Sequence, residues 1–318
     1  MNNNDKIKKS IVESIVVISV MALYIVYGIH SISLLMLFIP LPFIVLGVRN
    51  GIYTNLISIV AASLIVGILL GFTSGASLIL IFAPLSLAIN YCIGNRKNST
   101  ETILFSTAAF FLSFIMFMFL EMKISNLNFA THFENILTQY MSIQVDMFKE
   151  MGATNSQILQ IRDFLESTYK AIIVLIPSLI GIFSLIIGYI NLFFSSIVLR
   201  KMGYGTVSLQ RFSRFKLPNN IIPGIGIMLL AAFIIKRMGI GYYEALLLNL
   251  TFLIGFVFFI QGLAVLDFLL VKSKAHLIFR ILILSINIIF VPMSSVLFFL
   301  GLIDSILDIR KIRKQRSR

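Results

Sequence analysis

Long apolar runs constrain this chain more than any other feature of its sequence. Between Lys170 and Arg200, for example, no residue is charged. The hydrocarbon core of a bilayer is about 30 Å thick, and a helix needs about 20 apolar residues to cross it. Lipid offers the backbone no hydrogen-bond partner, so only helices and closed barrels span it. Strict two-residue alternation is absent, which argues against a barrel. The sequence therefore predicts an all-α, polytopic membrane helix bundle.

Nine segments qualify as candidate membrane helices, and two of them are marginal. The segment 32–48 is short and contains Pro40 and Pro42, whereas 219–237 contains Pro223 and ends in two basic residues. We therefore expect eight or nine hydrophobic helices. The nine segments are 11–29, 32–48, 52–71, 75–93, 102–121, 169–199, 219–237, 244–271 and 277–303.

Composition supports a membrane protein over a soluble one. The chain is 58% hydrophobic and 12% charged, and the charged fraction of a soluble domain is about twice as high. The net charge of +13 comes from short segments between the apolar runs and from the tail. Basic residues in such positions face anionic lipid and set orientation. No nucleic-acid-binding motif accompanies them. The expected partner is the lipid bilayer, and no nucleic acid is expected.

Lysines and arginines in the short loops predict the orientation, because basic loops stay on the cytoplasmic side. This rule places the N-terminus inside. For Arg49 a contact with an anion or a lipid headgroup is the alternative to a purely orienting charge. The basic residues expected to set topology or contact lipid are Arg49, Arg200, Lys201, Arg214, Lys216 and Arg310.

The basic tail at 304–318 conflicts with a simple count of nine crossings, which would place it outside. One solution makes the segment 219–237 a re-entrant element. Another breaks 277–303 into a hairpin at Pro292. We expect both termini to be cytoplasmic and the tail to lie inside.

One long hydrophilic stretch, 122–168, is expected outside the membrane as an insertion into a single domain that covers residues 1–318. Apolar residues recur in it near helical spacing, and Gly152 interrupts the pattern. Thr154 followed by Gln157 predicts a capping box that opens a second helix. The insertion is therefore expected to form two amphipathic helices. They would act as a lid over an outward-facing cavity, or simply cover helix ends at the interface.

The sixth segment carries a stripe of small and polar residues at helical spacing. Small residues let helices approach closely, and Asn191 can hydrogen-bond across the contact. The stripe is either a packing seam or the wall of a polar cavity. Its members are Pro177, Gly181, Ser184, Gly188, Asn191 and Ser195.

The third segment shows a second pattern of small residues. Ser63, Gly67, Gly71 and Gly75 lie four residues apart. This spacing predicts a ladder on one helix face, where another helix packs closely.

Residues that carry chemistry are sparse. Ionisable residues such as Glu13, Asp267 and Asp304 lie near predicted helix ends, whereas Asn249 and Gln261 sit deeper in the eighth segment. No chain of buried acids and bases suggests a proton relay. Zinc, nucleophile-elbow and phosphate-loop motifs are missing, and the histidines and the single cysteine are scattered. We expect no catalytic residues, no metal, no cofactor and no enzyme activity.

Several stretches together resemble a known family. They are Pro40-Leu41-Pro42 before Gly47-Val48-Arg49-Asn50-Gly51, Gln261-Gly262-Leu263-Ala264-Val265, Gly301-Leu302-Ile303-Asp304 with Asp308-Ile309-Arg310-Lys311, and the basic stretch Arg214–Pro218. Their order and spacing resemble the YybS-like bacterial membrane proteins, a domain of unknown function. The resemblance covers nearly the whole chain.

The resemblance implies a protein of the bacterial cytoplasmic membrane. It also implies distant similarity to the S components of energy-coupling-factor transporters and to MreD-like proteins, and so a helical core of the S-component or Gx-transporter kind. The first helix lacks the Ala-xxx-Ala step with which many S components dock their coupling protein.

Two functions remain open from the sequence. The first is a transporter-like protein that binds a small solute between the sixth and eighth segments. The second is a non-enzymatic scaffold that recruits or positions membrane protein partners. The residues expected to line the solute site are Ser184, Asn191, Ser195, Asn249 and Gln261. Helix packing is expected at Gly67, Gly71, Gly75, Gly181 and Gly188.

Overall fold

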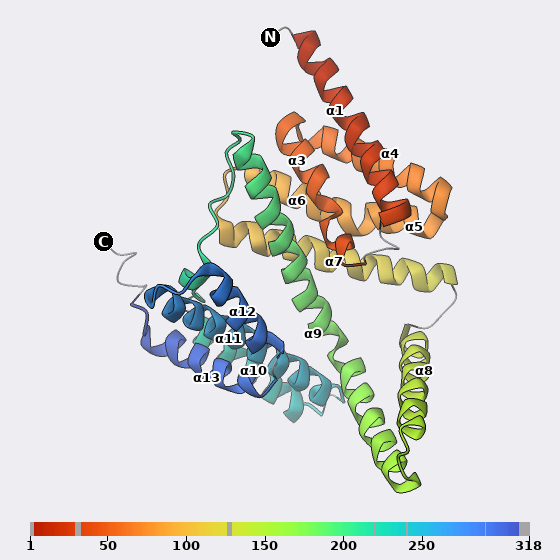
Figure 1. The fold of residues 1–318 in the computed structure, drawn as a ribbon, viewed down its shortest axis with the longest axis vertical. Coiled ribbons are helices and arrows are strands. Elements are labelled where there is room, and N and C mark those ends of the chain that lie inside the picture. Colours follow the sequence, from red (N-terminus) through yellow and green to blue (C-terminus); the bar gives the residue numbers. More distant parts are fainter. Residues whose placement is uncertain are drawn as a thin grey trace. The chain divides into compact units, whose positions relative to one another are not determined.

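A computed structural model describes residues 3–28, 33–125, 129–218, 220–239, 241–289 and 291–311. The elements in these ranges are helices, with no strand among them (Figure 1). The all-α fold class is therefore confirmed. By the contacts between its residues the chain divides into two compact units, and the single membrane domain expected from the sequence stays a prediction. Unit 1 is Met1–Tyr169 with Leu179–Leu209, and unit 2 is Lys170–Ser178 with Gln210–Arg318.

Six helices within the described residues are long and apolar enough to cross a membrane. A bent helix pair near the C-terminus raises the number to seven if it counts as one span. The expected eight or nine segments also included two short helices, α3 (Pro40–Asn50) and α10 (Ile221–Arg237). The six long helices are Ile7–Gly28, Ile52–Leu70, Phe72–Gly94, Ser99–Ile124, Asn155–Lys201 and Tyr243–Lys272.

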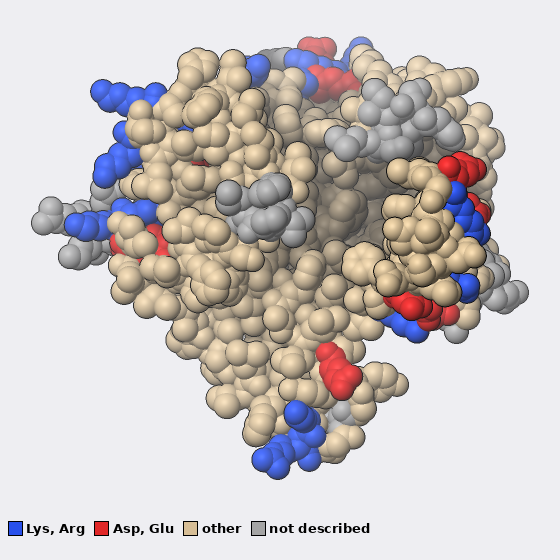
Figure 2. Space-filling view, turned by 60° about the horizontal axis from the view of Figure 1, so that its bottom comes forward, with Lys and Arg blue, Asp and Glu red and all other residues tan. Residues whose placement is uncertain are grey.

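The surface fits a lipid environment. Figure 2 shows a face on which Lys, Arg, Asp and Glu are sparse over wide areas. On the helix Ile52–Leu70, for example, Ile57 is 68% exposed and Ile68 is 84% exposed. Large apolar side chains that are this exposed along a whole helix would be unusual in a soluble monomer.

Unit 1 contains the helices from the N-terminus to most of α9. Its core is formed by apolar side chains that include Phe43, Ile59, Leu85 and Leu192. The elements are α1 (Asn3–Leu23), η1 (Tyr24–Gly28), η2 (Ser33–Phe38), α3, α4 (Ile52–Leu70), α5 (Phe72–Ser77), η3 (Leu78–Phe82), α6 (Ala83–Gly94), α7 (Ser99–Ser125), α8 (Phe129–Glu150) and α9 (Asn155–Lys201).

The predicted glycine ladder is split by a turn. Helix α4 ends at Leu70, and Gly71 follows with φ of +97°, a backbone conformation that glycine adopts without steric cost. The chain then folds back, so that the Ser63 hydroxyl donates to the Gly75 carbonyl at 2.6 Å. A Cβ on Gly75 would come within 2.8 Å of the Gly67 Cα. The small residues therefore pack α4 against α5, instead of forming one continuous face.

The hydrophilic stretch forms two helices, α8 and the start of α9, joined at Gly152 with φ of +85°. The predicted capping box is present, and the Thr154 N–H donates to the Gln157 side chain at 2.9 Å. Helix α9 is 47 residues long. The second amphipathic helix and the sixth apolar segment are thus one continuous helix.

Unit 2 holds η4 (Phe212–Arg214), α10, α11 (Tyr243–Lys272), α12 (Leu277–Ile289) and α13 (Val291–Leu307), together with a short part of α9. Helices α12 and α13 are bent by 110° relative to each other. The hairpin at Pro292, one of the two solutions that the sequence offered for the position of the basic tail, stays a prediction. The tail beyond Lys311 lies outside the described residues.

Two glycines let α11 and α13 cross with their backbones in contact. A Cβ on Gly262 would overlap the Leu297 carbonyl, and a Cβ on Gly301 would overlap the Phe258 carbonyl. Phe258 packs edge-on against Phe298 beside this crossing, at 5.6 Å between ring centroids. Any larger residue at either glycine must push the two helices apart.

We expect Gly262→Ala to destabilise the protein by about 1–3 kcal/mol, as overpacked cores do. Gly255→Ala on the same helix is the matched control, because a Cβ there meets nothing within 4 Å. Thermal unfolding of the purified protein in detergent measures both. Equal melting temperatures for the two variants would contradict the close crossing.

Candidate functional site

A buried charged network lies beside the crossing of α11 and α13 in unit 2. The Asp304 and Arg310 side chains are 0% and 1% exposed, and Arg310 Nη2 lies 2.8 Å from Asp304 Oδ2. Gln261 donates to the same carboxylate oxygen at 2.6 Å. An isolated buried charge is costly, whereas a paired and hydrogen-bonded charge is tolerated.

The network also holds the loop that precedes α10. Arg310 donates to the carbonyls of Ser213 and Phe215 at 2.9 and 2.7 Å, and Gln261 Oε1 accepts from the Leu217 N–H at 3.1 Å. Charge-assisted bonds of this kind are roughly twice as strong as neutral ones. These bonds connect the loop before α10 to α11 and to Arg310, although the three lie far apart in the sequence.

Two basic residues that were expected to set topology or contact lipid have charged partners within unit 2. Arg310 was expected to set topology or contact lipid, but its guanidinium is buried in the network. Lys216 was assigned the same role, and it forms an ion pair with Asp308. Arg214, by contrast, is exposed.

Further polar contacts in unit 2 follow the same principle. Arg280 forms a bidentate pair with Asp267, with contacts of 2.7 and 3.0 Å from Nη2. Asn249 Oδ1 accepts from the Ser178 hydroxyl and N–H at 2.6 and 3.1 Å. The Asn249 amide donates to the carbonyls of Val174 and Ala245. Each of these side chains therefore has a hydrogen-bond partner within unit 2.

The predicted stripe on α9 is buried within unit 1 from Ser184 onward. Ser184, Asn191 and Ser195 are all 0% exposed. A Cβ on Gly188 would come within 2.8 Å of the Ser106 hydroxyl of α7, whereas nothing lies within 4 Å at Gly181. Gly188 thus permits close approach of α7, and Gly181 shows no comparable contact.

The hydrogen bonds of the stripe are mostly internal to its helix. Ser184 and Ser195 donate to carbonyls of the preceding turn, at 2.7 and 3.2 Å. The Asn191 amide also reaches η2, where it donates to the Leu37 carbonyl at 2.8 Å. The Asn191 Oδ1 atom, however, is buried and has no partner.

Several other buried polar atoms in unit 1 also lack a partner. Apart from Arg49 Nε on α3, they belong to three helices, and a buried group without a partner costs about 1–3 kcal/mol. Each one in a native structure calls for an explanation such as water, an ion or a ligand. These atoms are both amide atoms of Asn90 on α6, Thr107 Oγ1 on α7, and Asn191 Oδ1 and Ser196 Oγ on α9.

Asn90 belongs to a small polar cluster that sequence reasoning missed. It lies against Gly47 of α3, where a Cβ would overlap its amide. Next to Gly47 lies Asn55 of α4, which is paired with Ser86 of α6 at 2.8 Å. The sequence does show these polar residues inside apolar segments. Their proximity, however, follows only from the packing of three helices.

The basic residues of unit 1 have different surroundings. Arg49 lies 2.6 Å from Glu13 of α1, and Asn50 donates to the same carboxylate at 2.8 Å. Arg200 donates to the Thr206 hydroxyl at 3.2 Å, and Lys201 is exposed. Arg49 is therefore part of a helix–helix contact between α1 and α3.

The residues expected to line one solute site belong to different units. Ser184, Asn191 and Ser195 are in unit 1, and Asn249 and Gln261 are in unit 2. Among the described residues, no group of three or more His, Cys, Asp or Glu is placed to hold a metal.

Comparisons with known proteins agree with the resemblance seen in the sequence. The model of a family described as "Predicted membrane protein (DUF2232)" matches residues 14–305. The chain is 24% identical over 275 residues to the "Uncharacterized protein YybS" of Bacillus subtilis (strain 168), covering 84% of this chain and 86% of that protein. No solved structure matches.

We expect Arg310→Met to lower the free energy of unfolding by about 3–5 kcal/mol, because it leaves Asp304 buried without its charge partner. Arg214→Met removes an exposed charge from the connected loop and should change stability little. The double variant Asp304→Leu/Arg310→Met should recover part of the loss. Melting temperatures in detergent measure all three, and an Arg310→Met protein as stable as Arg214→Met would refute the network.

Proposed function

We propose, given that the chain belongs to this DUF2232 family of predicted membrane proteins, that unit 1 binds a small, polar, uncharged solute among its helices. The protein would be transporter-like and non-enzymatic. The site would be formed by Asn90, Asn191 and Ser196, with Thr107 on the neighbouring helix.

The observation that carries the proposal is the set of unpartnered buried atoms on α6, α7 and α9. Lipid cannot satisfy such atoms, and polar side chains that pack helices together do so by bonding to one another across the contact, which these atoms do not. Both donors and acceptors occur in the set, because the Asn90 amide offers both and the hydroxyls can act as either. No unpaired charge accompanies them, so a neutral hydrogen-bonding solute fits best.

Irregular helices in unit 1 give independent support. The turns η1 and η3 are π-helical, and η2 is a 3-10 helix that leads into the proline-containing α3. Single π turns inside α-helices occur frequently at functional sites. Broken helices also surround the substrate sites of many transporters.

The proposed solute site does not include Asn249 and Gln261, which were expected from the sequence to line it. Their amide groups already have partners within unit 2. A ligand would have to break these bonds before it could use them. We therefore assign them to the stability of unit 2.

A role in protein recruitment is the second candidate, and the α8–α9 hairpin favours it. Phe148, Met151, Ile161 and Phe164 line an open cleft of about 610 Å³ there. Met151 is 77% exposed and Phe164 is 67% exposed. Such anchors are typical of sites that bind another protein. Replacing Met151 and Phe164 by Ser should then abolish capture of a partner without affecting the interior of unit 1.

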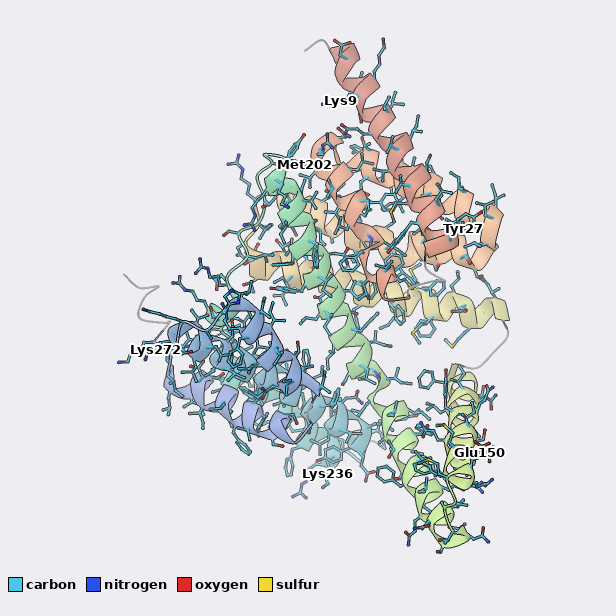
Figure 3. All side chains as sticks on the ribbon, in the orientation of Figure 1. Lys9, Tyr27, Glu150, Met202, Lys236 and Lys272 are labelled. Carbon is cyan, nitrogen blue, oxygen red and sulfur yellow. The ribbon has the colours of Figure 1, made fainter. Side chains whose placement is uncertain are left out.

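We also propose that the N-terminus and the basic end of unit 2 face the cytoplasm. Lys236 lies in the last turn of α10 and Lys272 ends α11, and Figure 3 shows them at opposite ends of unit 2. Arg310 and Leu217 meet Gln261 in the half of α11 that ends at Lys272. Most basic residues of unit 2 thus gather toward the Lys272 end, and the positive-inside rule orients that end inward.

A panel of single-cysteine variants tests both proposals, because the chain has one natural cysteine, Cys92. In a Cys92→Ala background, Ser196→Cys should react with a small methanethiosulfonate amine. Leu192→Cys on the same helix should react at least tenfold more slowly. Both positions are 0% exposed. A faster reaction at Ser196→Cys would therefore mean that a polar path from solvent reaches this position and does not reach Leu192→Cys.

Orientation is measured in the same panel with a membrane-impermeant maleimide on intact cells. Lys236→Cys should be labelled from outside, and Lys272→Cys only after the membrane is opened. Equal and negligible reactivity at Ser196→Cys and Leu192→Cys would count against a solute site. The reverse labelling of the two lysine positions would invert the orientation without affecting that result.

A further inference from the structure

An apolar groove lies between α1, α3 and α9 in unit 1 and ends at a polar group. Its volume is about 390 Å³. Its apolar lining includes Val12, Val16 and Val17 of α1, Leu41 and Val45 of α3, and Val198 of α9. Apart from Glu13 and Arg49, every residue that lines it is apolar.

Arg49 supplies a hydrogen-bond donor at the polar end. One guanidinium nitrogen, Nη2, is held by Glu13 at 2.6 Å, and the Nε atom is buried without a partner. The guanidinium also lies 6.0 Å from the centre of the Tyr204 ring. Asn50 donates to the other oxygen of Glu13. The guanidinium is thus fixed in place, its Nε donor is buried and unpaired, and 21% of the Arg49 side chain stays exposed.

Two lysines lie on helices that form the groove, toward its polar end. Lys9 precedes Glu13 by one helical turn, and Lys201 follows Val198 by three residues, so each shares a helix face with a lining residue. Figure 3 shows Lys9 and Met202 toward one end of unit 1 and Tyr27 at the far end of the first helix. Two lysines therefore lie about one helical turn beyond residues that line the groove, next to its Glu13–Arg49 pair.

We propose that this groove holds one acyl chain of an anionic phospholipid, whose phosphate lies at Arg49 and the neighbouring lysines. The apolar walls match a hydrocarbon chain, and the basic end matches a phosphate, which arginine recognises with directed N–H donors. An uncharged chain alone would leave the Arg49 donor unused. A soluble anion alone would leave the apolar walls unfilled.

This inference is independent of the solute site, because it involves different residues on α1 and α3. It also gives Arg49 a role beyond orientation. Anionic lipid would then join three helices of unit 1 at their basic end.

Native mass spectrometry of the purified protein tests the site, with phosphatidylglycerol and phosphatidylcholine of equal chain length as probes. The wild type should bind one phosphatidylglycerol about tenfold more tightly than phosphatidylcholine, the ratio that corresponds to about 1.4 kcal/mol. Arg49→Gln should remove most of this preference. Arg237→Gln, which changes an exposed arginine of unit 2, should leave it within about twofold.

Val45→Phe is the second variant, because it fills the groove and leaves the ion pair in place. It should weaken binding of both lipids. Glycerol phosphate at millimolar concentration should not compete. Equal affinities of the wild type for the two lipids, unchanged binding in Val45→Phe, or displacement by glycerol phosphate would each overturn the proposal.

Discussion

A polar group inside a membrane protein must find its hydrogen-bond partner within the protein or in something that enters, because hydrocarbon offers none. The two units meet this constraint in different ways. In unit 2, Gln261, Asp304 and Arg310 bond to one another and to the loop before α10. In unit 1, Asn90 and Ser196 keep buried atoms without partners. We interpret the hydrogen-bonded network of unit 2, called the lock below, as stabilising the fold. We interpret the unpartnered atoms of unit 1 as a binding site.

The lock in unit 2 depends on the glycines beside it. Gly262 and Gly301 bring the backbones of α11 and α13 together, and Gln261 and Asp304 project from the same crossing. These residues belong to two of the stretches that resemble the YybS-like family. Their proximity gives that motif a physical meaning, because the close crossing excludes water and lipid from a buried ion pair.

Local patterns in the sequence predicted the local structure well. The apolar runs predicted the helices, Thr154 and Gln157 predicted the capping box, and the α9 stripe is buried from Ser184 onward. The glycine pattern of α4 was misread, because its four-residue spacing continues past the turn at Gly71. Contacts such as Arg49 with Glu13 and Arg310 with Ser213 join distant segments. No local pattern encodes them, so the sequence did not reveal the lock or the Asn90 cluster.

The central claim is that the polar atoms inside unit 1 serve a ligand and not the fold. Thr107→Val tests it most directly, because it removes a buried hydroxyl that has no partner and keeps the side-chain shape. Thr102→Val on the same helix removes a hydroxyl that donates to Asn98 at 2.8 Å. The account predicts that the melting temperature of the purified protein rises or stays unchanged in Thr107→Val and falls in Thr102→Val. A fall of similar size in both variants would contradict it.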